Sequence, residues 1–176
     1  KEGEKVLNLE KDPYGIKVTT NQKSYLAKKA VITAGAWTSE LISEFHSILT
    51  PVRQVMGWFK PKKEEDFTKE VFPVFNLKVK EGHFYGFPSL DQTGLKIGKW
   101  QHRHEKTVPD QLRTDIDKED EEVLRICLKH YFPKANGQLL NAKACMFTNT
   151  PDEHFLIHQS PSMPLLSASG FSGHGF

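Results

Sequence analysis

Short segments of alternating hydrophobic and polar residues recur along the chain, and this pattern predicts β-strands rather than long helices. Residues 6–10 and 15–20 alternate in this way. They are joined by the turn-forming run Lys11-Asp12-Pro13-Tyr14, so we expect a β-hairpin. Residues 30–34 form a mostly apolar run, which is typical of a strand that is buried on both faces.

Two segments have the features of helices. Thr38 or Ser39 is placed to cap a helix over residues 40–46. A second helix is expected to begin at the acidic run 117–122, because carboxylates stabilise the positive end of the helix dipole. Its apolar residues follow at helical spacing before Pro133 ends it, namely Leu124, Cys127, Leu128 and Tyr131.

The remaining apolar segments predict an α+β fold with a mixed, largely antiparallel sheet and flanking helices. We expect this sheet domain over residues 51–163. Residues 1–50, with a hairpin, a strand and a helix, are expected to be part of a neighbouring domain, to which residues 164–176 return with a last strand and loop. The strands expected after Pro51 are residues 52–59, 71–79, 83–87, 94–101, 138–148, 154–158 and 165–169.

Composition and charge narrow the classes of partner. The chain of 176 residues has 24 Lys and Arg against 22 Asp and Glu, with the two signs interspersed, so we do not expect nucleic acid as a partner. The apolar runs are too short to span a bilayer, so we expect no membrane partner. Two cysteines do not form a disulfide framework, which favours a reducing compartment, and we expect the cytoplasm.

One cysteine and one glycine-rich run are the strongest candidates for chemistry. Cys145 opens the run Cys-Met-Phe-Thr-Asn-Thr-Pro-Asp-Glu-His-Phe on an expected strand. Composition alone favours a buried structural thiol there, but a thiolate can also attach to a cofactor covalently. The glycine-rich run comprises Gly170, Phe171, Ser172, Gly173, His174 and Gly175. Such a turn, if it leads into a helix, suits an electron-rich or anionic cofactor group.

Together these two runs resemble the C-terminal half of the sarcosine oxidase and N-methyltryptophan oxidase family of FAD-dependent amine oxidases. The resemblance implies that Cys145 carries FAD through a thioether, with Met146 beside it, and that the glycine-rich run wraps the flavin. It also implies that residues 1–50 and 164–176 belong to an FAD-binding domain and that 51–163 bind substrate. In the family, the residues matching Gly35, Ala36 and Trp37 close a strand against the cofactor.

Lys96 and Tyr85 are the candidate catalytic residues. Lys96 alternates with Leu95 and Ile97, so its side chain is expected on the opposite face of a strand. A lysine in such a position is usually solvent-facing, but a fixed cation beside a flavin stabilises the negative charge that appears when O₂ is reduced. The resemblance gives Lys96 this oxygen-activating role and places Tyr85 in the substrate pocket.

One position departs from the family pattern. Sarcosine oxidases have a histidine four residues after the matching lysine, and this chain has Trp100. The two-residue period of a strand would place His102 and His104 on the same face as Trp100. No acidic or thiol residue is spaced to complete a metal site with these histidines, so we expect none.

The resemblance implies a fragment of an enzyme that oxidises the C–N bond of a secondary or N-methylated amino acid. FAD would accept a hydride equivalent and O₂ would reoxidise it, giving an imine and H₂O₂. Two alternatives remain open: a sheet-based binding or assembly module without chemistry of its own, and a subunit of a flavin amine dehydrogenase. No Gly-x-Gly-x-x-Gly follows a strand, so we expect this chain by itself to hold little or no FAD and to be inactive alone.

Overall fold

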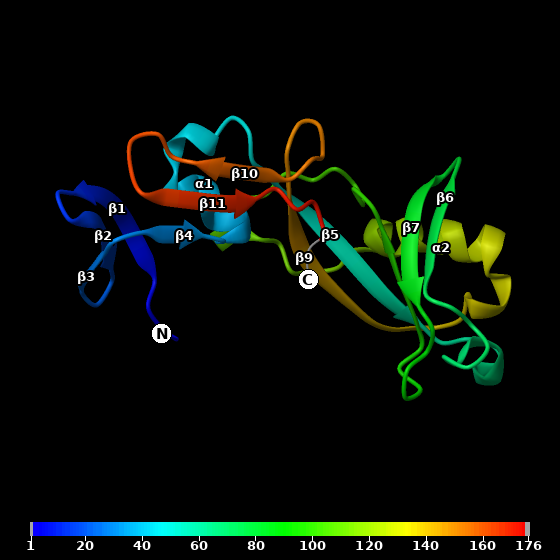
Figure 1. Cartoon of the computed structure of the whole chain (residues 1–176). Helices are drawn as coiled ribbons and strands as arrows, with labels where there is room; N and C mark the ends of the chain where they lie inside the picture. Colours follow the sequence, from blue (N-terminus) through cyan, green and yellow to red (C-terminus); the bar gives the residue numbers. More distant parts are fainter. Residues whose placement is uncertain (1, 175–176) are drawn as a thin grey trace. The chain divides into compact units, whose positions relative to one another are not determined.

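The computed structural model describes residues 2–174 and divides into two compact units (Figure 1). The first unit comprises the described residues up to Pro51 and those from Phe147 onward, and the second is Val52–Met146. The boundaries fall inside two strands, β5 (Thr50–Phe59) and β9 (Leu139–Asn149). None of the described helices is long and apolar enough to cross a membrane.

The predicted hairpin is confirmed near the start of the first unit. Strands β1 (Val6–Asp12) and β2 (Gly15–Thr20) pair antiparallel through a tight turn. A third strand that the sequence pattern did not indicate, β3 (Ser24–Ala27), pairs antiparallel with β2. Gly15 is required at the turn, because its φ is +147° and a Cβ there would lie 2.1 Å from the carbonyl oxygen of Ala27.

A second small sheet of the first unit joins segments that are far apart in the sequence. Strand β11 (Leu165–Ser169) pairs parallel with β4 (Ala30–Ile32) and antiparallel with β10 (Leu156–Gln159), as Figure 1 shows. The compact units therefore divide after Met146, whereas the sequence pattern predicts that the chain returns to the neighbouring domain only after residue 163. The difference arises because β10 pairs with β11. The core of this unit contains Ile16, Ile32, Ile42, Phe45, Leu49 and Leu165.

The predicted helix over residues 40–46 is wrong. The segment forms α1 (Thr38–Leu41) between two short 3₁₀ turns, η1 (Gly35–Trp37) and η2 (Ser43–Phe45). Ile42 interrupts the helix, because its φ of −128° and ψ of 94° are extended and its side chain is drawn into the core. Neither Thr38 nor Ser39 acts as an N-cap, since the N-cap position of α1 is Trp37 and no side chain caps it.

The second unit is built on a five-stranded sheet with the order β6-β7-β8-β5-β9. The new strands are β6 (Phe75–Val79), β7 (Gly82–Phe87) and β8 (Leu95–Lys99), and β6, β7, β8 and β5 pair antiparallel in turn. Strands β4 and β11 pair parallel, so residues 2–174 form mixed, largely antiparallel sheets with few helices.

Helix α2 (Lys118–Tyr131) covers one face of this sheet, and its prediction is confirmed. Asp117 is its N-cap and forms a capping box with Asp120. Short 3₁₀ turns complete the unit: η3 (Glu64–Phe67), η4 (Pro109–Gln111) and η5 (Pro133–Ala135). The helix and sheet share a core in which Leu124, Cys127 and Leu128 of α2 meet Val55, Phe59, Phe84, Leu95 and Ile97.

A buried ion pair fixes α2 to β5. Arg53 is 1% exposed, and its two terminal nitrogens donate to both carboxylate oxygens of Asp120 at 2.9 and 2.8 Å. Asp120 is fully buried and also accepts from Arg103, from His102 and from the backbone of Asp117. Burial raises the pKa of the Asp120 carboxyl, but these hydrogen bonds outweigh burial and hold its pKa well below the usual range.

Replacing Arg53 by Met should lower the free energy of unfolding by about 3–5 kcal/mol, because Asp120 would stay buried without its bidentate partner. Urea denaturation measures this loss. Lys129→Met is the matched control, since it removes the half-exposed Lys129–Glu122 pair of the same helix and should cost less than about 1 kcal/mol. Similar small losses in the two variants would show that the buried pair does not hold the unit together.

Candidate functional site

The face of the sheet opposite α2 carries the two residues predicted to be catalytic. Leu95 and Ile97 of β8 are fully buried in the core, whereas Lys96 between them is only partly buried. On β7, Phe84 is in the same core, and its neighbour Tyr85 is partly exposed. The alternation of the strands therefore separates a core face from an open face that bears Lys96 and Tyr85.

Lys96 lies between two aromatic residues of the neighbouring strands. The register pairs Lys96 with Trp58 of β5 on one side and with Phe87 of β7 on the other. Its ammonium nitrogen Nζ is 5.2 Å from the centre of the Trp58 ring and 5.3 Å from that of Phe87, within the range of cation–π contacts. Sequence reasoning missed both rings, because alternation gives the face of a residue but not its cross-strand partner.

Tyr85 lies over a glycine of β8, two residues along each strand from the pair of Phe87 and Lys96. Its partner in the register is Gly98, and a Cβ at Gly98 would lie 2.5 Å from Cζ and 2.6 Å from the hydroxyl oxygen of Tyr85. The phenol ring therefore occupies the space above Gly98. Burial raises the pKa of Tyr85 to about 12, so its hydroxyl stays protonated and can donate a hydrogen bond at neutral pH.

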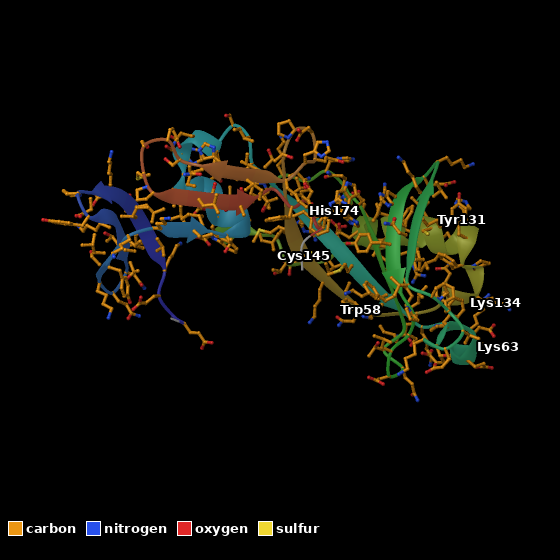
Figure 2. The ribbon with its side chains drawn as sticks, viewed as in Figure 1. Trp58, Lys63, Tyr131, Lys134, Cys145 and His174 are labelled. Atoms are coloured by element: carbon orange, nitrogen blue, oxygen red, sulfur yellow. The ribbon has the colours of Figure 1, made fainter. Side chains whose placement is uncertain are left out.

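Cys145 lies on β9, where Figure 2 labels it. Its thiol is partly buried, and burial raises its pKa, while the positive charge of Lys96 acts in the opposite direction. Cys145 also contributes to the raised pKa of Tyr85, so Cys145 interacts electrostatically with both Lys96 and Tyr85. Met146 follows Cys145 on β9 and is partly buried.

Cys127, the other cysteine, differs from Cys145 in its burial. It is fully buried in the core, and burial raises its pKa to about 12, as expected of an inert thiol.

The glycine-rich run of the first unit forms a tight turn after β11. Gly170 and Gly173 have φ angles of +68° and +79°, and Ser172 between them has +48°. A Cβ at Gly170 would lie 2.6 Å from Thr150, so glycine is needed there for space as well as conformation. The turn is tied back by Ser172, whose backbone N–H donates to the carbonyl of Thr148 at 3.1 Å.

The far side of this turn is partly open. Phe171 packs its ring against Phe155 at 4.8 Å between centroids. His174, labelled in Figure 2, borders a surface hollow of about 660 Å³ whose other lining residues are Asp152, Glu153, His154 and Phe155. Gly175, the last residue predicted to contact the cofactor, lies outside the described residues, and so does the start of any helix after this turn.

The run Gly35-Ala36-Trp37 of the first unit forms the 3₁₀ turn η1. Gly35 has a φ of +53°, and no atom would lie within 4 Å of a Cβ added there. Ala36 is buried and Trp37 is 37% exposed. These three residues and the turn after β11 both belong to the first unit, while Lys96, Tyr85, Cys145 and Met146 belong to the second.

The expectation that His102 and His104 share a strand face with Trp100 is wrong. Strand β8 ends at Lys99, and the chain then turns, with Gln101 and His104 at positive φ. His102 is 2% exposed and bonds to Asp120 through Nε2 at 3.1 Å, and burial lowers its pKa. The Trp100 ring lies beside that of His83, with 6.1 Å between the centroids. Across residues 2–174, no three His, Cys, Asp or Glu side chains gather in a way that could hold a metal ion.

Comparison with known proteins agrees on one family. The model of the family described as FAD dependent oxidoreductase matches residues 1–176. Monomeric sarcosine oxidase from Bacillus sp. (strain NS-129) is 40% identical over 167 residues, which cover 92% of this chain and 43% of that protein. N-methyl-L-tryptophan oxidase from Salmonella typhi is 34% identical over 175 residues, which cover 97% and 45%. The chain thus spans less than half the length of these relatives.

Solved structures show the same fold at lower sequence identity. Fructosyl amine:oxygen oxidoreductase (Amadoriase I) from Aspergillus fumigatus has a TM-score of 0.75 and 23% identity, over 97% of this chain and 41% of that one. Glycine oxidase from Geobacillus kaustophilus has a TM-score of 0.69 and 17% identity, over 95% and 42%. At these identities the likeness supports the fold alone.

Gly98→Ala should destabilise the second unit by about 1–3 kcal/mol, because the added methyl group would displace the Tyr85 ring or the strand. The contact predicts a large coupling in a double-mutant cycle. In a Tyr85→Ala background, where the ring is absent, Gly98→Ala should cost less. Urea denaturation of the four proteins measures this, and equal costs in the two backgrounds would mean that Tyr85 does not lie over Gly98.

Proposed function

Because the chain belongs to the FAD dependent oxidoreductase family, we propose that it forms part of a flavoprotein amine oxidase. Its substrate is a secondary or N-methylated amino acid. The C–H and N–H bonds at the oxidised C–N bond are lost, and an imine forms. The two electrons and two protons released convert O₂ to H₂O₂. The flavin supplies the site that accepts these electrons and passes them on.

The observation that carries this proposal is the placement of Lys96, Tyr85 and Cys145 on strands of one sheet. The residues suit a flavin: the thiol of Cys145 is only partly buried, the charge of Lys96 opposes the burial that raises the pKa of this thiol, and Tyr85 keeps its proton. In the first unit, Gly170 and Gly173 have no side chains and adopt positive φ angles, so the backbone can turn tightly there.

Each residue has a distinct role in the proposal. Lys96 places a positive charge where negative charge develops as O₂ is reduced. Tyr85 donates a hydrogen bond on the substrate side, and Cys145 supplies the sulfur of a thioether to FAD. Met146, Gly35, Ala36, Trp37 and the described residues of the glycine turn are proposed to line the cofactor. Because Trp100 stands where the resemblance expects a histidine, the proposed substrate class is not restricted to sarcosine.

We also propose the cytoplasm as the location, which the two free cysteines support. The chain by itself is expected to hold little FAD, because it lacks the glycine motif that binds the dinucleotide phosphates.

In a protein of full family length that contains this sequence, Cys145→Ser should abolish covalent attachment of flavin, because a hydroxyl is a far poorer nucleophile than a thiolate. Acid precipitation followed by absorbance of the pellet measures attached flavin. Cys127→Ala is the matched control and should keep the flavin attached, since Cys127 is enclosed in the core. Flavin that stays with the acid-denatured Cys145→Ser polypeptide would place the attachment elsewhere.

Lys96→Met in the same protein should slow reoxidation by O₂ on the order of 100-fold or more, with a much smaller effect on reduction by substrate. Stopped-flow measurement separates the two half-reactions, and H₂O₂ release distinguishes an oxidase from a dehydrogenase. Lys99→Met is the control, because it removes the same charge from the same strand, where Lys99 lies beside the core residue Phe84. Equal losses in both half-reactions would remove the oxygen-activating role from Lys96.

A further inference from the structure

The surroundings of Lys96 contain aromatic rings where a buried or half-buried lysine ordinarily has an acid. None of the ion pairs found among residues 2–174 involves Lys96. Its two cross-strand neighbours are Trp58 and Phe87, and their ring centres lie at nearly equal distances of 5.2 and 5.3 Å from Nζ. Three adjacent strands, β7, β8 and β5, therefore present a row in the order ring, cation, ring.

The nature of these neighbours changes what the ammonium group can do. A carboxylate would hold the ammonium in place but would also cancel its charge at a distance. The face of an aromatic ring attracts the cation through its quadrupole and adds no net negative charge. A lysine held between rings is thus restrained and keeps its full positive potential for another anion.

We propose that Trp58, with Phe87, positions the ammonium group of Lys96 for the reduction of O₂. This inference rests on the proposed function of Lys96 and adds the residues through which Lys96 acts. Trp58 is the principal positioning residue, because the indole face attracts cations more strongly than a phenyl ring. Trp58 is also partly buried, whereas Phe87 is 39% exposed. Figure 2 labels Trp58 on β5.

The register of the sheet makes this position stable. Trp58, Lys96 and Phe87 come from directly paired positions, so their Cα atoms are fixed by the backbone hydrogen bonds of the sheet. The opposite faces of the same strands are anchored by Phe59, Leu95 and Ile97 in the core. The aromatic pair therefore needs to order only the flexible part of the lysine side chain.

The test compares half-reactions in the family-length flavoprotein that contains this sequence. Trp58→Leu should slow reoxidation by O₂ by about 2- to 30-fold, the range expected from loss of a cation–π contact, while reduction by substrate stays within about twofold. Trp58→Phe keeps a ring and should retain most of the rate. In a Lys96→Met background, Trp58→Leu should have no further effect on reoxidation, because the cation that it positions is absent.

A second readout does not depend on turnover. The ring currents of Trp58 and Phe87 should shift the ε protons of Lys96 upfield in NMR spectra of ¹³C-lysine-labelled protein, and Lys96→Met identifies the signal. Trp58→Leu should move this signal toward the position of exposed lysines, and Trp58→Phe should move it less. If Trp58→Leu does not fold, Trp58→Phe and Phe87→Leu give the same comparison at smaller amplitude.

The possible outcomes separate the two proposals. An unchanged reoxidation rate in Lys96→Met would overturn the proposed role of Lys96 and this inference with it. A slow Lys96→Met combined with a wild-type rate in Trp58→Leu would overturn this inference and leave the proposed function standing. An equal effect of Trp58→Leu with and without Lys96 would also overturn it, since Trp58 would then act by another route.

Discussion

The bidentate ion pair between Arg53 and Asp120 is the interaction on which the second unit depends. Arg53 comes from the start of β5, and Asp120 lies in the first turn of α2, where it also completes the capping box with Asp117. One carboxylate thus stabilises the beginning of the helix and fixes it to the sheet. His102 and Arg103, in the turn after β8, reach the same carboxylate, so the turn is fixed as well. Because the group is buried, its hydrogen bonds must all be satisfied together.

Fixing α2 on one face of the sheet determines what the other face can carry. Arg53, Val55 and Phe59 of β5 point toward the helix side, so the alternate residue Trp58 is left for the open face. The same alternation on β8 places Lys96 beside it. The chemistry proposed for this chain therefore depends on residues that are one position away, along the strand, from residues that form the core. A shift of register by one residue would exchange the two sets.

The sequence predicted the regular parts of this structure well, because periodicity and turn residues report on local burial. The hairpin of β1 and β2, helix α2 with its acidic start, and most strands of the larger sheet were found in this way. The helix after Ser39 failed because core packing at Ile42 overrides the local pattern. His102 was misplaced because nothing local shows that a strand ends at Lys99 or that Asp120 accepts a bond from it. The roles proposed for Lys96, Tyr85 and Cys145 rest on the resemblance, and the rings beside Lys96 could be found only from the strand register.

The parallel pair of β4 and β11 has a consequence for how the chain folds during synthesis. Ala30 and Leu165 are paired although about 135 residues separate them, and all of the second unit lies between. During translation, β4 leaves the ribosome long before its partner exists. The larger sheet and α2 can form first, because all of their strands and the helix precede β11 in the chain. The parallel pairing of β4 with β11 cannot form until β11 emerges, and a strand edge without its partner is prone to aggregation. The described part of the first unit is thus encoded on both sides of the second unit, and its parallel pairing can form only after the second unit has been synthesised.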